Sequence, residues 1–161
     1  MTISFYRNLF DYNYWARDRF FEVLGHLDPQ QFILDLGDGV GSIRDKLTHI
    51  FAAEKIWLER LTGSPEPFMT PDRVGDLPAL QELWSRTEQA WVSFLDAQTN
   101  ETLKDSFRYH DLKGDEHHSK LWSILTHVTN HGTYHRGQAA SLVRRLTGKL
   151  PVTDYIAFSR L

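Results

Sequence analysis

Four long stretches of this chain repeat apolar residues every three or four positions, which is the period of an amphipathic α-helix. The stretches are separated by segments that contain glycine or proline, the residues that most often end helices. Amphipathic helices of similar length bury their apolar faces most simply against one another. The sequence therefore predicts an all-α fold, a four-helix bundle, built as one domain over residues 1–161.

Helix-ending signals place the first two helices. The first is expected over residues 5–27, with Pro29 beyond its end and one apolar stripe facing the core: Phe5, Leu9, Tyr12, Ala16, Phe20, Val23 and Leu27. A loop with glycines at 37, 39 and 41 follows. The second helix is expected over residues 43–62, because Ser42 can cap free N–H groups at its start and Gly63 suits its end.

The connection between the second and third helices is unusually long. Residues 63–76 contain three prolines and cannot be helical throughout. At ~3.3 Å per extended residue this segment can cross the length of the bundle, so the second and third helices can run parallel instead of forming a hairpin. The third helix is expected to begin near Asp76, with Pro78 in its first turn.

A small β-hairpin is predicted before the fourth helix. Phe107 and Tyr109 precede a turn at Lys113–Gly114–Asp115, and the segment 107–120 is the least helical part of the sequence. The fourth helix is expected over residues 119–147, ended by Gly148 and Pro151. Its apolar stripe is Leu121, Leu125, Val128, then His131 or Gly132, then His135, Ala139, Leu142 and Leu146.

Composition excludes several classes of function. The formal net charge of −3 gives no general attraction to a phosphate backbone, so a nucleic-acid partner is disfavoured. No apolar run approaches a membrane span, and the first residues carry no apolar signal core, so a cytoplasmic protein is expected. The chain has no cysteine, which excludes disulfides, thiolate ligands and a cysteine nucleophile. Any thiol chemistry would need a thiol from outside.

Three of the eight histidines suggest a metal site. His131 and His135 lie four residues apart, on one helix face and about 6 Å apart along the axis, within the apolar stripe. Buried imidazoles need partners, either a metal ion or hydroxyl and backbone groups. His49, near the middle of the second helix, can supply a third nitrogen from a facing helix. Three neutral imidazoles leave positions open on Zn²⁺ or Ni²⁺.

Other polar residues offer alternatives to this assignment. His127 and His131 form a second pair with the same spacing, but His127 and His135 are about 12 Å apart along the helix, so one ion cannot easily take all three. The pair His131 and His135 is preferred, with His127 supporting the site or the core.

Glu54 is a candidate acid near the site, although a solvated glutamate is the simpler interpretation. Gly132 replaces the glutamate of zinc-protease helices, and it is expected to give close helix approach or room beside the metal. Four histidines are expected in solvated loops or helix ends: His26, His110, His117 and His118.

The sequence resembles the DinB/YfiT-like family of bacterial four-helix-bundle metalloproteins, which is unrelated to the DNA polymerase that shares the DinB name. The resemblance covers nearly the whole chain and is carried by four segments: residues 12–16 (YNYWA), 47–50 (LTHI), 127–138 (HVTNHGTYHRGQ) and 151–156 (PVTDYI). It implies that His49, His131 and His135 bind zinc or nickel, that helices two and three are joined by a long crossover, and that the protein forms homodimers and is associated with stress responses.

The resemblance also implies a class of reaction. Relatives include transferases and isomerases that use a low-molecular-weight thiol. The leading hypothesis is a metal-dependent enzyme that adds or transfers such a thiol to a small-molecule electrophile. The alternatives are a metal-dependent hydrolase, for which Glu54 or His127 would be the acid or base, and a metal-binding stress protein without catalytic activity.

Overall fold

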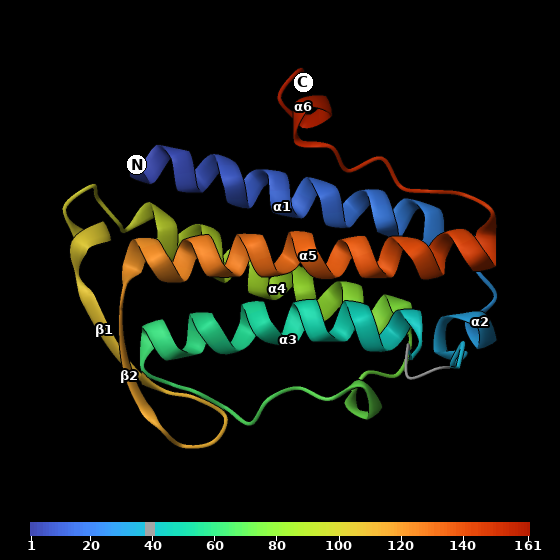
Figure 1. The fold of residues 1–161 in the computed structure, drawn as a ribbon, viewed down its shortest axis with the longest axis horizontal. Helices are drawn as coiled ribbons and strands as arrows, with labels where there is room; N and C mark the ends of the chain where they lie inside the picture. The colour runs from blue at the N-terminus through green and yellow to red at the C-terminus, as the bar shows by residue number, and fades with distance from the viewer. Residues whose placement is uncertain (38–40) are drawn as a thin grey trace.

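The computed structural model describes residues 1–37 and 41–161, and four long helices packed side by side form the main body of this part of the chain (Figure 1). The predicted all-α bundle with a small hairpin is confirmed; the predicted loop glycine Gly39 lies outside the described residues. The four helices are α1 (Ile3–Leu24), α3 (Ile43–Thr62), α4 (Leu77–Asp96) and α5 (Leu121–Thr147). The shorter elements are α2 (Pro29–Ile33), η1 (Pro71–Arg73), η2 (Thr102–Lys104), β1 (Ser106–His110), β2 (Glu116–Lys120) and α6 (Tyr155–Phe158).

Local capping chemistry sets the ends of the helices. Ser42 and Asp45 form a reciprocal capping box at the start of α3, and Gly63 ends that helix with φ +82°, a left-handed conformation that glycine adopts without steric cost. Asp76 caps α4, which begins at Leu77, close to the predicted start. The short helix α2 was not predicted; Asp28 caps it and Pro29 is its first residue, so α1 ends at Leu24 instead of continuing to Leu27.

The long crossover makes α3 and α4 parallel. In Figure 1 the segment after α3 returns along the length of the bundle before α4 begins. The side-chain contacts follow the same order along both helices, with Phe51 against Trp84 and the backbone carbonyl of Glu54 accepting from the indole of Trp91. The predicted parallel arrangement is therefore confirmed. Helix α5 packs antiparallel to α3, and this contact is the most extensive between helices.

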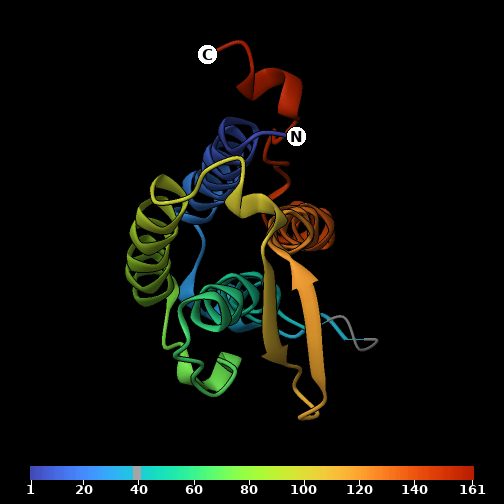
Figure 2. The ribbon, with the colours of Figure 1, turned by 90° about the vertical axis from the view of Figure 1, so that its left-hand side faces the viewer.

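The predicted hairpin is present and lies across one end of the bundle. Strands β1 and β2 pair antiparallel, with Ser106 opposite Lys120 and His110 opposite Glu116. Figure 2 shows the two strands extending from α5 past α3. Tyr109 of β1 packs edge-on against Trp57 of α3, with ring centroids 4.8 Å apart. Strand β2 thus occupies Glu116–Lys120, and α5 begins at Leu121, two residues later than predicted.

The buried face of α1 differs from the predicted stripe by one position. Phe5 is 45% exposed, whereas Tyr6 and Phe10 are buried in the core. The prediction was wrong for Phe5, whereas Ala16 and Phe20 are buried as predicted; the buried face also carries Asn13 and Arg17, two polar residues that an apolar pattern does not count. No helix in the described part of the chain has both the length and the apolarity to cross a membrane.

Candidate metal centre

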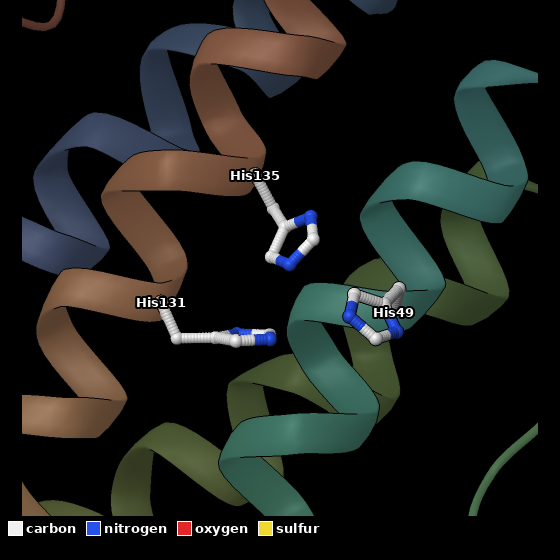
Figure 3. Close-up of side chains that lie close together, drawn as sticks. All are labelled: His49, His131 and His135. Carbon is white, nitrogen blue, oxygen red and sulfur yellow. The ribbon is translucent and has the colours of Figure 1, made fainter. Parts of the chain in front are cut away.

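Three imidazoles meet on one side of the contact between α3 and α5. His49 projects from α3, and His131 and His135 project from adjacent turns of α5; all three point toward one another (Figure 3). One ring nitrogen of each lies within 4.8 Å of one from each of the others. The ring centroids are 4.3–5.0 Å apart. The three histidines predicted as ligands are therefore brought together, and we refer to them as the histidine triad.

The triad flanks the hydrophobic core and is open to solvent on one side. All three side chains are half-buried, whereas Gly132, Arg136 and Ala139 of α5 are fully buried. Of the two residues expected in the stripe at this turn, Gly132 and not His131 is the buried one, and the prediction that His135 lies in the stripe was wrong by one position. Since the stripe passes through Gly132 and Arg136, the histidines lie at its edge, where a ligand from solvent can reach them.

Burial and mutual repulsion keep part of the triad neutral. The pKa of His131 is lowered to about 3, chiefly because the ring is desolvated and then because His135, His49 and His127 lie close to it. Desolvation, together with His135 and Lys46, also lowers the pKa of His49. Neutral imidazole is the form that binds metals, because a protonated ring has no free lone pair.

One residue of α5 orients a ring of the triad. The side-chain oxygen of Gln138 lies 2.9 Å from Nδ1 of His135. With Nδ1–H donating to that oxygen, Nε2 of His135 carries the free lone pair and faces the other two rings. Gln138 is the last residue of the segment 127–138 that resembles the family. Its position three residues after a candidate ligand is the sequence signal that points to an orienting role.

The residues present fit a divalent metal ion. Three nitrogens within 4.8 Å of one another could hold one ion, and small rotations of the side chains would bring them to the ~2.0–2.1 Å typical of zinc–imidazole bonds. Among residues 1–37 and 41–161, no carboxylate or further histidine joins the group. An ion held here would keep open positions for a small molecule, which is the arrangement of catalytic and not of structural zinc sites.

His127 lies beside the triad but outside it. Its exposed ring is 5.6 Å from that of His131 and 5.4 Å from that of Trp57, measured between centroids. On α5 it is therefore His131 and His135, and not His127, that group with His49. The four histidines expected in solvated positions are all exposed: His26, His110, His117 and His118.

Glu54 is not the solvated residue that was expected. Its side chain is 1% exposed, and its two carboxylate oxygens accept from the amide of Asn13 and the indole N–H of Trp84, each at 2.7 Å. Burial raises the pKa of this carboxyl, against the lowering effect of these two hydrogen bonds and of Arg136. Glu54 follows His49 by five residues, or about 140° around the helix, so it faces α1 and α4 and not the triad.

Glycine 132 permits a close contact between α5 and α1. A Cβ atom at this position would lie 2.7 Å from Oδ1 of Asn13 and 3.0 Å from Nη1 of Arg136. Arg136 donates to Asn13, which in turn donates to Glu54. Close helix approach, one of the two expected roles of Gly132, is thus its role here. We call Asn13, Glu54, Trp84 and Arg136 the buried relay; its polar members are the residues that hydrophobic periodicity did not identify.

Comparison with known proteins agrees with this architecture. The characteristic DinB family sequence matches residues 1–161, the whole chain. The chain belongs to the DinB family. It is 24% identical over 155 residues to protein DinB of Bacillus subtilis (strain 168), covering 91% of this chain and 89% of that protein. The crystal structure of a conserved protein from Enterococcus faecalis shares the DinB-like fold with a TM-score of 0.70 at 17% identity, over 88% of this chain and 96% of that one.

Proposed function

We propose that this DinB family protein is a metal-dependent enzyme in which His49, His131 and His135 hold one Zn²⁺ or Ni²⁺ ion and present it to a low-molecular-weight thiol. The observation that carries the proposal is the half-exposed triad of imidazole donors with no protein group among the described residues to fill the remaining positions. When bound, the ion supplies Lewis acidity that lowers the pKa of a coordinated thiol.

The chain's own residues would position the ion and shape access to it. Gln138 holds the His135 ring in one tautomer. Phe68, from the crossover, packs on His49 with ring centroids 6.2 Å apart and so covers one side of the triad. The chain itself has no cysteine, so the thiol would be a co-substrate and the electrophile a second small molecule. The homodimer and the stress-associated role stay predictions.

The positions of Glu54 and His127 give a hydrolase less support than the sequence does. Both oxygens of Glu54 are occupied by α1 and α4, which leaves His127 as the candidate base near the triad. Its ring is exposed and has no recorded orienting hydrogen bond among the described residues, whereas a general base needs a fixed position. A non-catalytic metal-binding protein is the remaining alternative, and a fully occupied coordination sphere in the loaded protein would favour it.

The first experiment is metal analysis of untagged protein and of His49→Ala and His135→Ala variants. We expect about one zinc or nickel per chain in the wild type and loss of the ion in both variants. His118→Ala, which removes an exposed histidine of β2, is the matched control and should keep the metal. A wild type that binds no divalent metal after reconstitution would overturn the proposal.

Thiol use needs a separate measurement. Cobalt-substituted protein titrated with small thiols should develop a sulfur-to-metal absorption band, and the band should saturate at about one thiol per chain. A loaded protein whose spectrum no thiol changes would contradict the thiol part of the proposal while leaving the metal site in place.

A further inference from the structure

A cavity lies beside the hairpin. Its volume is about 640 Å³, and it is lined by three segments: the second half of α3, the start of the crossover at residues 63–68, and β1 with its turn at residues 108–112. Neither the metal site nor the core requires this space. The side chains that define its chemistry are Arg60, Phe68, Arg108 and Tyr109.

Arg60 carries an unpaired positive charge in this cavity. Its guanidinium lies over the rings of Trp57 and Tyr109, at 4.9 and 5.4 Å from their centroids. Among the described residues it forms no recorded hydrogen bond or ion pair with a carboxylate, and desolvation lowers its pKa. A guanidinium that lies over two aromatic rings has less rotational freedom, and its fork of N–H groups suits recognition of a planar anion.

The two acidic residues of the cavity are bound to other groups. Glu66 accepts from Lys55 at 2.8 Å. Asp111 accepts from two backbone N–H groups of its own turn and lies 3.2 Å from Nε2 of His117. Among the described residues neither carboxylate forms an ion pair with Arg60, although the charge of Asp111 acts on its pKa, so the guanidinium N–H groups are available to a ligand. Their presence also disfavours a multiply charged ligand such as a phosphate, because two negative charges already lie nearby.

Two contacts connect this cavity to the triad. Phe68 lines the cavity and packs on His49. On the other side, Trp57 lies beneath Arg60 and against His127, whose ring neighbours His131. His49 and Arg60 are separated by roughly 16 Å along α3, at ~1.5 Å per residue. An extended small molecule can therefore contact the triad at one end and Arg60 at the other.

We infer that the cavity is the binding site for a carboxylate group of the substrate, with Arg60 as the residue that binds it. The inference rests on the proposed function for the position of the reacting end, and it adds that the thiol or its acceptor is an elongated monoanionic carboxylate. Arg60 is then a specificity-determining residue. Trp57 and Tyr109 are positioning residues, because they act by holding its guanidinium.

The test uses mercaptocarboxylates of graded chain length and mercapto alcohols of the same lengths. Binding to zinc-loaded and to metal-free protein is measured by calorimetry. We expect the acid of the best-fitting length to bind about ten- to a hundredfold more tightly than the matching alcohol, since hydrogen bonds between charged groups are worth this much. Arg60→Gln should remove the preference, and Arg60→Lys should keep part of it. Arg86→Gln, on the exposed face of α4, is the matched control and should leave it unchanged.

The results of these measurements either support or overturn the carboxylate site. Equal binding of acid and alcohol by the wild type, or a preference that survives Arg60→Gln in a folded variant, overturns it. Displacement of the acid by inorganic phosphate at lower concentration than by acetate overturns the assignment to a carboxylate. An Arg60-dependent preference in metal-free protein, together with no thiol binding to the metal in zinc-loaded protein, supports the carboxylate site and refutes the thiol part of the proposed function.

Discussion

Two polar clusters share helices α3 and α5 but lie on different faces of them. The histidine triad takes His49 from α3 and His131 from α5, and the buried relay takes Glu54 and Arg136 from the same two helices. The triad is half-exposed, and its only recorded hydrogen bond among the described residues is to Gln138. In the relay, by contrast, no side-chain nitrogen or oxygen is buried without a partner in the described part of the chain.

The triad has the properties of a binding site, whereas the buried relay has those of a structural hydrogen-bond network. Hydrogen bonds within the relay satisfy groups that would be costly to bury alone, and they join α1, α3, α4 and α5 at one level of the bundle. The triad satisfies little within the protein, so its lone pairs stay available to a metal ion. The relay therefore fixes the relative position of α3 and α5, on which the spacing of the triad depends.

Removal of the relay's carboxylate is expected to have the largest effect. Glu54→Ala leaves the buried Arg136 without its nearby negative charge and leaves the Asn13 amide and the Trp84 indole without acceptors. We expect a loss of about 3–5 kcal/mol in the free energy of unfolding, measured by urea denaturation. Glu82→Ala, at an exposed ion pair, should cost less than about 1 kcal/mol. Equal losses in the two variants would show that the relay does not stabilise the bundle.

Gln138→Ala tests whether the triad depends on orientation. Without the acceptor for Nδ1–H, the His135 ring can rotate or change tautomer, so zinc affinity should fall about ten- to a hundredfold. The measurement is competition with a chromophoric chelator. Stability of the metal-free protein should change by less than about 1 kcal/mol, because Gln138 is only half-buried. Unchanged affinity would exclude Gln138 as an orienting residue.

Two glycines of α5 allow a matched comparison. Gly132→Ala would place a methyl group 2.7 Å from Asn13, and we expect a net loss of about 1–2 kcal/mol despite the better helix propensity of alanine. Gly137→Ala meets nothing within 4 Å, so it should gain up to about 1 kcal/mol. Thermal unfolding of both variants measures the difference. The same sign of change in the two would refute the close contact at Gly132.

The smallest effect is a dependence on pH. Burial raises the pKa of Glu54, so the folded state binds this proton more tightly than the unfolded state does. Its contribution to stability is therefore present at low pH and is lost as pH rises through the raised pKa. Relative to Glu54→Gln, the wild type should lose free energy of unfolding as pH rises from about 4 to 7. A difference between the two proteins that is constant with pH would contradict the raised pKa.

Much of the architecture was predictable because its causes are local. Capping by Ser42 and Asp76, and the left-handed glycines Gly63 and Gly148, fixed helix ends to within a residue or two. Because residues 63–76 contain three prolines, they cannot be helical throughout, and the extended segment is long enough for α3 and α4 to run parallel. The triad was also predictable, because a spacing of four residues places His131 and His135 on the same side of any helix.

The tertiary structure alone decided which polar residues are buried. Asn13, Glu54 and Arg136 read as surface residues in the sequence, since a charge or amide is buried only when distant segments supply its partners. Their partners are 41 and 123 residues away along the chain. Arg60 also depends on a distant segment, because its neighbour Tyr109 belongs to the hairpin. Helical spacing, which the sequence carries, determined the donors of the triad, whereas packing between helices determined how they are held in place.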